Sequence, residues 1–253
     1  MTQVDDPTLT RRERQREGTV AEIVATARAL LAEGVELSLR AVATRMGMTA
    51  PALYRYVASY QELVDVVAFE IDRVATEGFQ AAADQHAPDD PAARLVAAGT
   101  EFRMWALANP REFSLVFANP VAEPMGHHRD LITVQSSCCL MTDLIFEIWQ
   151  QRRFPVPAVD DLPPDVRASV LEPLIPADVD KIPLEHRGLV WVYMQGWTQL
   201  YGVVTLEVMG HMDPRVIESG EMFVDVVRRF APTLDLADDL PRLEAIVRAR
   251  LTA

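Results

Sequence analysis

Two short amphipathic segments on either side of Gly47 contain the residues whose types and spacing favour a specific chemistry. Glycine readily adopts the positive φ that reverses a chain between two helices. The second segment is too short to support a core, because its apolar contacts reduce to Leu53 and Val57. Its other residues can face outward: Ala50, Pro51, Ala52, Tyr54, Arg55 and Tyr56.

This outward set is suited to the major groove of double-stranded DNA. Small side chains at the start of a helix permit close approach, and their methyl groups can touch thymine. The hydroxyl groups of Tyr54 and Tyr56 can reach phosphates. An ordinary pair of packed helices with half-buried tyrosines explains the same pattern, and it is the commoner arrangement for a generic helix–glycine–helix sequence.

Charge is distributed unevenly along the chain. The 253 residues include 37 acidic and 24 basic ones, and the resulting net charge of −13 would by itself disfavour nucleic acid. Between residues 10 and 60, however, eight arginines stand against five acidic residues, a local charge of +3, whereas the chain from residue 61 onward carries −14. A basic segment joined to an acidic body is expected of a DNA-binding region fused to another domain.

No other cluster of reactive side chains predicts a catalytic or metal site. His127 and His128 lie near Glu123 and Asp130, but adjacent histidines on a helix point about 100° apart and rarely share an ion. The sequence has no pattern of nucleophile and base, glycine-rich phosphate loop or paired carboxylates. We expect neither an enzyme nor a metal or cofactor, and a helical enzyme with a buried acid–base pair is the alternative.

The two cysteines, Cys138 and Cys139, are adjacent and cannot join distant segments, which favours a reducing compartment. We interpret them as packing residues rather than as a redox switch. The stretch Met1–Thr10 is polar and contains no apolar region typical of a secretory signal. The sequence therefore predicts a cytoplasmic protein.

The stretch from Gly188 to Leu206 carries no charge and approaches the length of a transmembrane helix. Several polar residues interrupt it, and Arg187 and Glu207 flank it. We therefore expect a helix buried at a subunit contact, and no membrane association.

Apolar residues spaced by three and four predict helices along most of the chain and no strand, so the expected fold class is all-α. Ser38, Thr49 and Ser59 are placed to cap helices. The proline-rich residues 154–183 should be mostly irregular. The predicted helices cover about residues 12–33, 39–46, 49–56, 59–83, 91–108, 110–118, 126–153, 165–171, 184–210, 214–230 and 238–251.

The run from Leu37 to Val57, continued by Ser59 and Glu62-Leu63, resembles the TetR family of ligand-responsive transcription regulators. The resemblance includes the long helix before this run and the capped helix after it. It implies an N-terminal helix-turn-helix domain followed by a larger helical domain that binds a ligand and dimerises. The implied boundaries are residues 1–60 for the DNA-binding domain, 38–57 for the helix-turn-helix, 59–83 for a linking helix and 61–253 for the second domain.

By position, the resemblance assigns DNA contacts to the helix before the turn, to the recognition helix and to the start of the linking helix. Two positions depart from the family: Tyr56 stands where histidine is frequent, and Tyr60 where a phosphate-binding lysine is common. A tyrosine hydroxyl at a helix N-terminus can bind phosphate but adds no charge. The expected DNA-binding residues are Arg40, Thr49, Ala50, Pro51, Ala52, Tyr54, Arg55, Tyr56 and Tyr60.

The second domain resembles the family more weakly, through Ala108–Phe113, Phe117, Trp197 and Gly202. Aromatic and thioether side chains are most often core residues, but the resemblance implies that some line a cavity for a small hydrophobic effector, beside a few polar anchors. The expected ligand-binding residues are Phe102, Trp105, Phe113, Phe117, Met141, Trp149, Met194, Gln195, Thr198 and Tyr201.

Together these features predict a homodimeric repressor that binds a palindromic operator and is released by its effector. The helices at 184–210 and 214–230 should pair with their two-fold mates, and a charge placed at Gly196 or Trp197 should separate the protomers. The alternative is a helical small-molecule-binding or scaffold protein that never touches DNA.

Overall fold

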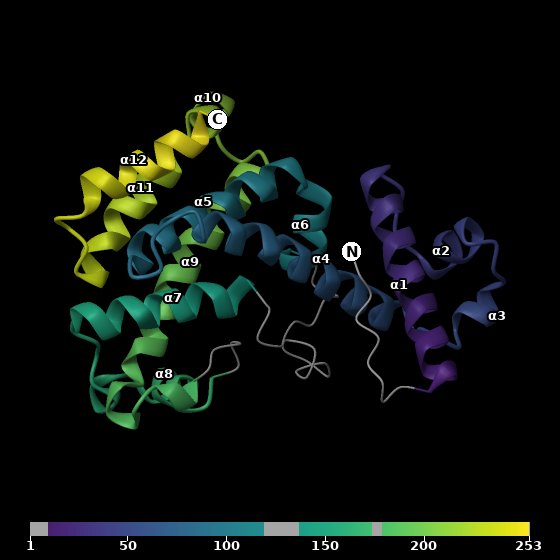
Figure 1. Cartoon of the computed structure of the whole chain (residues 1–253), viewed down its shortest axis with the longest axis horizontal. Helices are drawn as coiled ribbons and strands as arrows, with labels where there is room; N and C mark the ends of the chain where they lie inside the picture. Colours follow the sequence, from purple (N-terminus) through teal and green to yellow (C-terminus); the bar gives the residue numbers. More distant parts are fainter. Residues whose placement is uncertain (1–9, 119–136, 174–178, 253) are drawn as a thin grey trace. The chain divides into compact units, whose positions relative to one another are not determined.

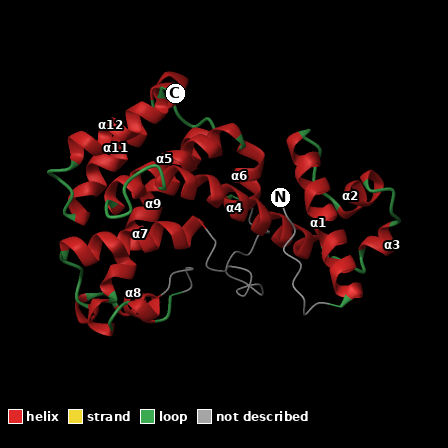
Figure 2. Ribbon diagram, in the orientation of Figure 1, coloured by secondary structure: helices red, strands yellow, loops and turns green. Residues whose placement is uncertain are grey.

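The computed structural model describes residues 10–118, 137–173 and 179–252 (Figure 1). Over these ranges the chain consists of helices, turns and loops and contains no strand (Figure 2). The predicted all-α fold class is therefore confirmed. The helices are α1 (Arg11–Ala32), α2 (Leu39–Arg45), α3 (Ala50–Leu53), α4 (Tyr60–Ala83), α5 (Pro91–Ala108), α6 (Pro110–Phe117), α7 (Ser137–Arg152), α8 (Pro164–Leu171), α9 (Gly188–Val208), α10 (Pro214–Ser219), α11 (Glu221–Phe230) and α12 (Leu240–Leu251).

The described residues form two compact units. The first contains residues 10–71 and 111–118, and the second contains residues 72–110, 137–173 and 179–252. Helix α4 is therefore shared between the units, with its division after Ile71. The predicted domain boundary at residue 60 coincides with the first residue of α4, and as a functional boundary it stays a prediction.

The first unit is built on the apolar face of α1. Ile23, Ala27 and Leu30 are each at most 3% exposed, and they recur at the spacing that places side chains on one face of a helix. Helix α2 packs against α1, and α3 packs against α2. Ser38 caps α2 as predicted, since its Oγ accepts the N–H of Ala41 at 3.1 Å.

The start of α4 is fixed by a reciprocal cap. The hydroxyl of Ser59 accepts the N–H of Glu62 at 3.0 Å, and the carboxylate of Glu62 accepts the N–H of Ala58. The predicted cap is confirmed, although the glutamate reaches one residue further back than in the usual capping box. In the first turns of the helix, the side chains of Leu63 and Val67 are fully buried.

Helix α5 is central to the second unit, where it packs against α7, α9 and α12 (Figure 1). Buried side chains surround most of its circumference, from Ala92 to Ala106, as expected for a helix covered on several sides. The Oδ1 of Asp90 accepts the N–H of Ala93 at 3.1 Å, and Pro91 occupies the first turn. These contacts fix where α5 begins.

The single helix predicted over residues 214–230 is wrong, because the segment forms two helices, α10 and α11. Gly220 lies between them with a φ of +65°, a left-handed conformation that ends α10. Leu251 of α12 lies so close that a Cβ on Gly220 would meet its Cδ1 at 2.6 Å. The break therefore serves the packing of α12, which apolar spacing within 214–230 does not reveal.

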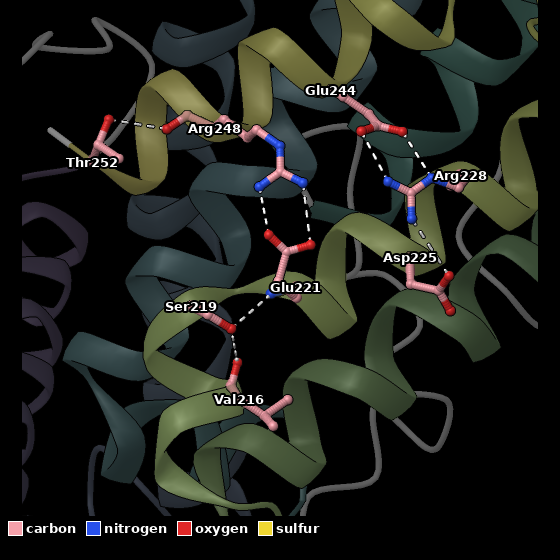
Figure 3. Close-up of polar contacts among 8 residues, drawn as sticks. All are labelled: Val216, Ser219, Glu221, Asp225, Arg228, Glu244, Arg248 and Thr252. Atoms are coloured by element: carbon pink, nitrogen blue, oxygen red, sulfur yellow. Dashed lines mark hydrogen bonds and ion pairs between the residues drawn. The ribbon is translucent and has the colours of Figure 1, made fainter.

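Paired charges join α11 to α12. Arg248 donates two hydrogen bonds to the carboxylate of Glu221, at 2.5 and 3.1 Å (Figure 3). Arg228 does the same to Glu244, with both distances at 2.9 Å. Val247 is fully buried on the same helix. Helix α12 is thus held by an apolar face and by two bidentate ion pairs to α11.

Most of the remaining predicted elements agree with the structure. The proline-rich stretch after α7 is mostly irregular, as expected, and contains the short helix α8. The first part of the helix predicted at 126–153 lies outside the described residues, and the rest is α7. Among the described helices, none is long and apolar enough to cross a membrane.

Candidate functional site

The turn between α2 and α3 is built around Gly47, as predicted. Gly47 has a φ of +67°, a conformation that costs glycine little. The N–H of Met48 bonds back to the carbonyl of Ala43 at 2.9 Å, which closes the end of α2. The chain therefore leaves α2 at Arg45 and enters α3 at Ala50, after only four intervening residues.

Helix α3 is anchored by two apolar side chains. Leu53 is fully buried and Val57 is 1% exposed, whereas Tyr54 is 50% exposed. The helix is shorter than predicted: it ends at Leu53 and continues as a turn, in which the N–H of Tyr56 bonds to the carbonyl of Leu53 at 2.9 Å. Thr49 precedes α3 without capping it through its side chain, so that expectation is wrong.

The anchoring of α3 leaves most of the predicted DNA-binding residues accessible. Ala50, Ala52 and Tyr56 are half-buried. The exposed members are Arg40, Thr49, Pro51, Tyr54, Arg55 and Tyr60. The first unit therefore presents small side chains, two tyrosine hydroxyls and two arginines on the outside of the helix-turn-helix.

Two arginines of this region differ in what holds them. The guanidinium of Arg40 has no ion-pair partner among the described residues. Arg45, in contrast, binds the carboxylate of Glu33 at 2.9 and 2.5 Å. Arg16 donates to the carbonyl of Arg55 at 2.9 Å and so ties α1 to the turn after α3. Arg40 is available for a phosphate or a base, whereas Arg45 is already neutralised.

Tyr60 is the first residue of α4 and is 39% exposed. The caps from Ser59 and Glu62 bind the same helix N-terminus. A carboxylate therefore lies where the positive end of the helix dipole would attract a phosphate. Any phosphate contact here depends on the Tyr60 hydroxyl more than on the helix end.

In the second unit, aromatic side chains of α4, α5 and α9 form a connected group. The ring centroid of Phe79 lies 5.7 Å from that of Phe102 and 5.9 Å from that of Trp105. Phe102 is 5.8 Å from Trp197, which stacks on Tyr201 at 5.6 Å. These five residues are called the aromatic cluster below. Three of them were predicted to bind ligand, and Phe79, which continues the apolar stripe of α4, was missed.

Other predicted ligand-binding residues have different neighbours. The ring of Trp149 on α7 lies 4.9 Å from that of His186, and the guanidinium of Arg153 lies over it at 4.4 Å. Phe113 and Phe117 of α6 contact each other at 5.3 Å within the first unit. Trp149, Phe113 and Phe117 therefore lie outside the aromatic cluster, and the last two belong to the other unit.

The remaining predicted residues lie on α7 and α9. Met141 is 7% exposed, and Met194 is half-buried. Gln195 and Thr198 were expected to be polar anchors for the ligand, but both residues are exposed. The hydroxyl of Thr198 donates to the carbonyl of Met194 at 2.7 Å, so it is satisfied within its own helix.

A buried ion pair that the sequence reasoning missed joins α5 to α9. Arg103 donates to both carboxylate oxygens of Glu207, at 2.6 and 3.2 Å, and to the carbonyl of Ile217 at 2.6 Å. The two charged side chains are 3% and 0% exposed. Burial raises the pKa of Glu207, and the guanidinium of Arg103 opposes that shift. The sequence offers one signal for this pair, since Arg103 is flanked directly by the apolar residues Phe102 and Met104.

A second acid, Asp72, is half-buried and has no arginine partner among the described residues. The Oδ2 of Asp72 on α4 accepts the N–H of Ser137 at 3.3 Å, whereas its Oδ1 is buried without a hydrogen-bond partner among the described residues. Burial raises the pKa of Asp72, and hydrogen bonding from Ser137 opposes that shift. The sequence reasoning did not single out this residue.

The thiols and histidines give no reactive centre in the described chain. Burial raises the pKa of Cys138 to about 12, so its thiol is protonated at neutral pH. No group of three or more metal-ligating side chains occurs within residues 10–118, 137–173 and 179–252. The cluster of His127, His128 and their acidic neighbours lies outside the described residues.

Comparison with known proteins places the chain among regulators. The family described as "Tetracyclin repressor-like, C-terminal domain" matches residues 95–230. The HTH-type transcriptional regulators Rv1816 of Mycobacterium tuberculosis and Mb1846 of Mycobacterium bovis are each 26% identical over 199 residues, which is 77% of this chain and 82% of theirs. The crystal structure of the regulatory protein SCO4313 superimposes with a TM-score of 0.56 at 26% identity, over 91% of this chain and 98% of that one.

Proposed function

The chain belongs to the TetR family of helix-turn-helix transcriptional regulators, and we propose that it is a homodimeric repressor, released from a palindromic operator by a small hydrophobic effector. The observation that carries the DNA-binding part is the anchoring of α3: Leu53 and Val57 are buried, and the neighbouring small and hydroxyl-bearing residues are accessible. The proposed DNA-binding domain is residues 1–60, and the proposed effector and dimer domain is residues 61–253.

The proposed DNA surface uses small residues for bases and hydroxyls for phosphates. Ala50 and Pro51 permit close approach of the start of α3 to base edges, and Tyr54 binds the backbone. Arg40 adds a cation from α2. Each half of the palindrome is then bound by one protomer, because the two-fold symmetry of the dimer matches that of the site.

Fluorescence polarisation with labelled duplexes from the region upstream of its own gene tests this surface. Arg40→Ala should weaken specific binding about tenfold, since it removes a cation that binds a base or a phosphate. Tyr54→Phe should weaken it by a few-fold, because one hydrogen bond is removed. Arg215→Ala, which removes an exposed arginine from the second unit, should leave binding unchanged.

A protein that never touches DNA would show no sequence preference in the same assay at low salt. That outcome would favour the scaffold or ligand-binding alternative. Wild-type affinity in both Arg40→Ala and Tyr54→Phe, with sequence preference intact, would place the reading surface elsewhere.

The proposed dimer contact lies on α9 and α11, which pack against each other within one chain. Leu206 and Met209, at the end of α9, are 42% and 38% exposed, and Met222 of α11 is 41% exposed. Such apolar side chains are typical of a surface covered by a partner. Burial of this face against a second copy, related by two-fold symmetry, gives the four-helix contact that we propose.

Leu206→Glu should convert the dimer to monomers in sedimentation-velocity experiments, because it places a charge inside the contact. Leu184→Glu is the matched control, since Leu184 is 66% exposed and lies outside α9 and α11. Gly196 is unsuited to this test: a Cβ there would meet the ring of Phe230 at 2.9 Å within the same chain. If the Leu206→Glu protein still sediments as a dimer, the contact lies on another surface.

For the effector, we propose the neighbourhood of the aromatic cluster. Phe102, Trp105 and Tyr201 offer apolar area and one hydroxyl in the second unit, the combination typical of small-molecule sites. Binding there would favour a conformation in which the two DNA-binding domains no longer match the operator spacing, a coupling of two sites that works in both directions.

A further inference from the structure

Asp72 carries a carboxylate that the protein leaves incompletely bound. Its Oδ2 accepts a long hydrogen bond, 3.3 Å from the backbone nitrogen of Ser137. Its Oδ1 is enclosed and accepts none from the described residues. No described arginine or lysine forms an ion pair with it. A buried carboxylate normally has a cation or several donors around it.

Glu207 shows how this protein stabilises a buried acid when the role is structural. Its carboxylate receives two hydrogen bonds from Arg103, the closer at 2.6 Å. Asp72 has no guanidinium beside it, and its hydrogen-bond donors are the backbone N–H and the side chain of Ser137. At Asp90, which caps α5, Oδ1 accepts the N–H of Ala93 at 3.1 Å and Oδ2 accepts a hydrogen bond from Arg242 at 2.7 Å, so both oxygens are bound. Capping alone therefore leaves the enclosed Oδ1 unexplained.

The position of Asp72 on α4 relates it to the aromatic cluster. Thr76 and Phe79 follow it by four and seven residues, the spacing of side chains on one helix face. Thr76 is buried, and its hydroxyl donates to the backbone carbonyl of Asp72, so it offers the Asp72 carboxylate no donor. Phe79 contacts Phe102 and Trp105. Asp72 thus lies about 10 Å along the helix from the start of the cluster, at 1.5 Å per residue.

We propose that Asp72 and the aromatic cluster together recognise an effector with a protonated amine at one end and an apolar, aromatic body. This deepens the proposed function, on which it rests, by naming the chemical class of the effector. The ammonium group supplies the hydrogen-bond donor and the positive charge that Oδ1 lacks. The rings of α5 and α9 bind the apolar body, and their faces also attract a cation.

The raised pKa of Asp72 is consistent with a carboxylate that has no counter-ion beside it. Without a cation, burial disfavours the charged form. An ammonium ion next to the carboxylate reverses that preference and strengthens the hydrogen bond between them. The charge of −14 carried by the chain from residue 61 onward also favours a cationic molecule over an anionic one.

Calorimetric titration of the full-length protein without DNA tests the inference with two matched probes. 4-Phenylbutylamine carries the ammonium group, and 4-phenylbutan-1-ol has the same length and ring without the charge. The wild-type protein should bind the amine about tenfold more tightly than the alcohol, the usual difference for one charge-assisted hydrogen bond. Asp72→Asn should abolish this preference while leaving the affinity for the alcohol unchanged.

Glu77→Gln is the matched control variant. It removes one negative charge from the same helix, at a side chain that is 66% exposed, and should keep the preference for the amine. Equal binding of the amine and the alcohol by the wild-type protein overturns the proposal whatever the variants do. A preference that persists in Asp72→Asn overturns the role of Asp72.

These results are independent of the DNA experiments. Failure of the proposed function would appear as a lack of sequence-specific duplex binding, whereas failure of this inference would appear in the ligand titration alone. Release of the labelled duplex by the amine, but not by the alcohol at the same concentration, would show that binding of the amine controls binding of DNA.

Discussion

The arginines of the two units differ in what they bind. In the first unit, Arg11, Arg12, Arg14 and Arg40 have no ion-pair partner among the described residues. In the second unit, most described arginines bind a carboxylate: Arg73, Arg94, Arg103, Arg152, Arg167, Arg215, Arg228, Arg229, Arg242, Arg248 and Arg250. In the first unit, the described arginines that form ion pairs are Arg28 and Arg45, with Glu112 and Glu33. Arginine therefore serves mainly internal cohesion in the second unit, whereas several arginines of the first unit stay available to an external anion.

This difference explains how a protein of charge −13 can bind DNA. The excess of acid belongs to the second unit, where it is partly neutralised by arginine. The first unit keeps several cations outside internal ion pairs, so their fields reach the solvent and phosphates. Net charge averages over two regions with opposite roles.

The largest expected effect is at the buried pair of the second unit. Arg103→Met leaves Glu207 enclosed without its cation, and should lower the free energy of unfolding by about 3–5 kcal/mol. Urea denaturation followed by circular dichroism, at one fixed protein concentration, measures the change. The double variant Arg103→Met/Glu207→Met should recover most of the stability, since the uncompensated charge is gone. A single variant as stable as the wild type would contradict the interpretation of this pair.

The next effect concerns the arginines of the first unit that lie outside internal ion pairs. Arg12→Gln/Arg14→Gln should reduce the slope of log affinity against log salt by about 1.8, because each phosphate that is no longer neutralised lowers it by about 0.9. Thermal stability should stay unchanged, because these side chains bind no described partner. Arg228→Gln/Arg248→Gln, the same charge change in the second unit, should leave the salt slope as it is. Equal slopes in both double variants would remove the distinction between the units.

A smaller effect depends on pH at Asp72. Burial raises its pKa above the ordinary 3.8, so the folded state holds the proton more tightly than the unfolded chain. Stability from the protonated form is present below pH 3.8 and is lost as pH rises through the folded pKa. Asp72→Asn should therefore melt above the wild type at pH 7, and the two should converge in acid. A lower melting temperature at pH 7 would instead identify Asp72 as a helix cap.

The smallest effect is expected at the exposed pair of Arg248 and Glu221 (Figure 3). Arg248→Gln should lower the melting temperature only slightly, because both side chains are largely in contact with water. The difference should vanish in about 1 M salt, where charges are screened within about 3 Å. A large, salt-independent decrease would show that this pair stabilises α12 through packing rather than charge.

Much of the first unit could be predicted because its signals are local. Ser38 caps α2 through the N–H of Ala41 and Gly47 turns the chain, both within a few residues, and the spacing of Leu53 and Val57 shows which side chains of this short segment are buried. The wrong expectations there are also local: Thr49 makes no side-chain cap and α3 ends early. Cap and turn preferences are strong, but a short helix leaves its last residues to tertiary contacts.

The second unit was less predictable because its defining contacts join distant residues. Arg103 and Glu207 lie 104 positions apart, and no local spacing relates them. Gly220 breaks a segment of continuous apolar periodicity because Leu251 packs against it. The predicted ligand-binding residues share a chemical character, but which of them meet depends on how α4, α5 and α9 pack.

The sequence by itself determined the all-α fold, most of its helix boundaries, the helix-turn-helix and the basic N-terminal segment, since these follow from periodicity, caps and charge within a few turns of chain. Only the tertiary structure decided which charges are paired, which aromatic rings meet and which acid is left with an enclosed, unbonded oxygen. The physical reason is that burial and ion pairing depend on neighbours in space, and residues far apart in the chain become neighbours only when the helices pack.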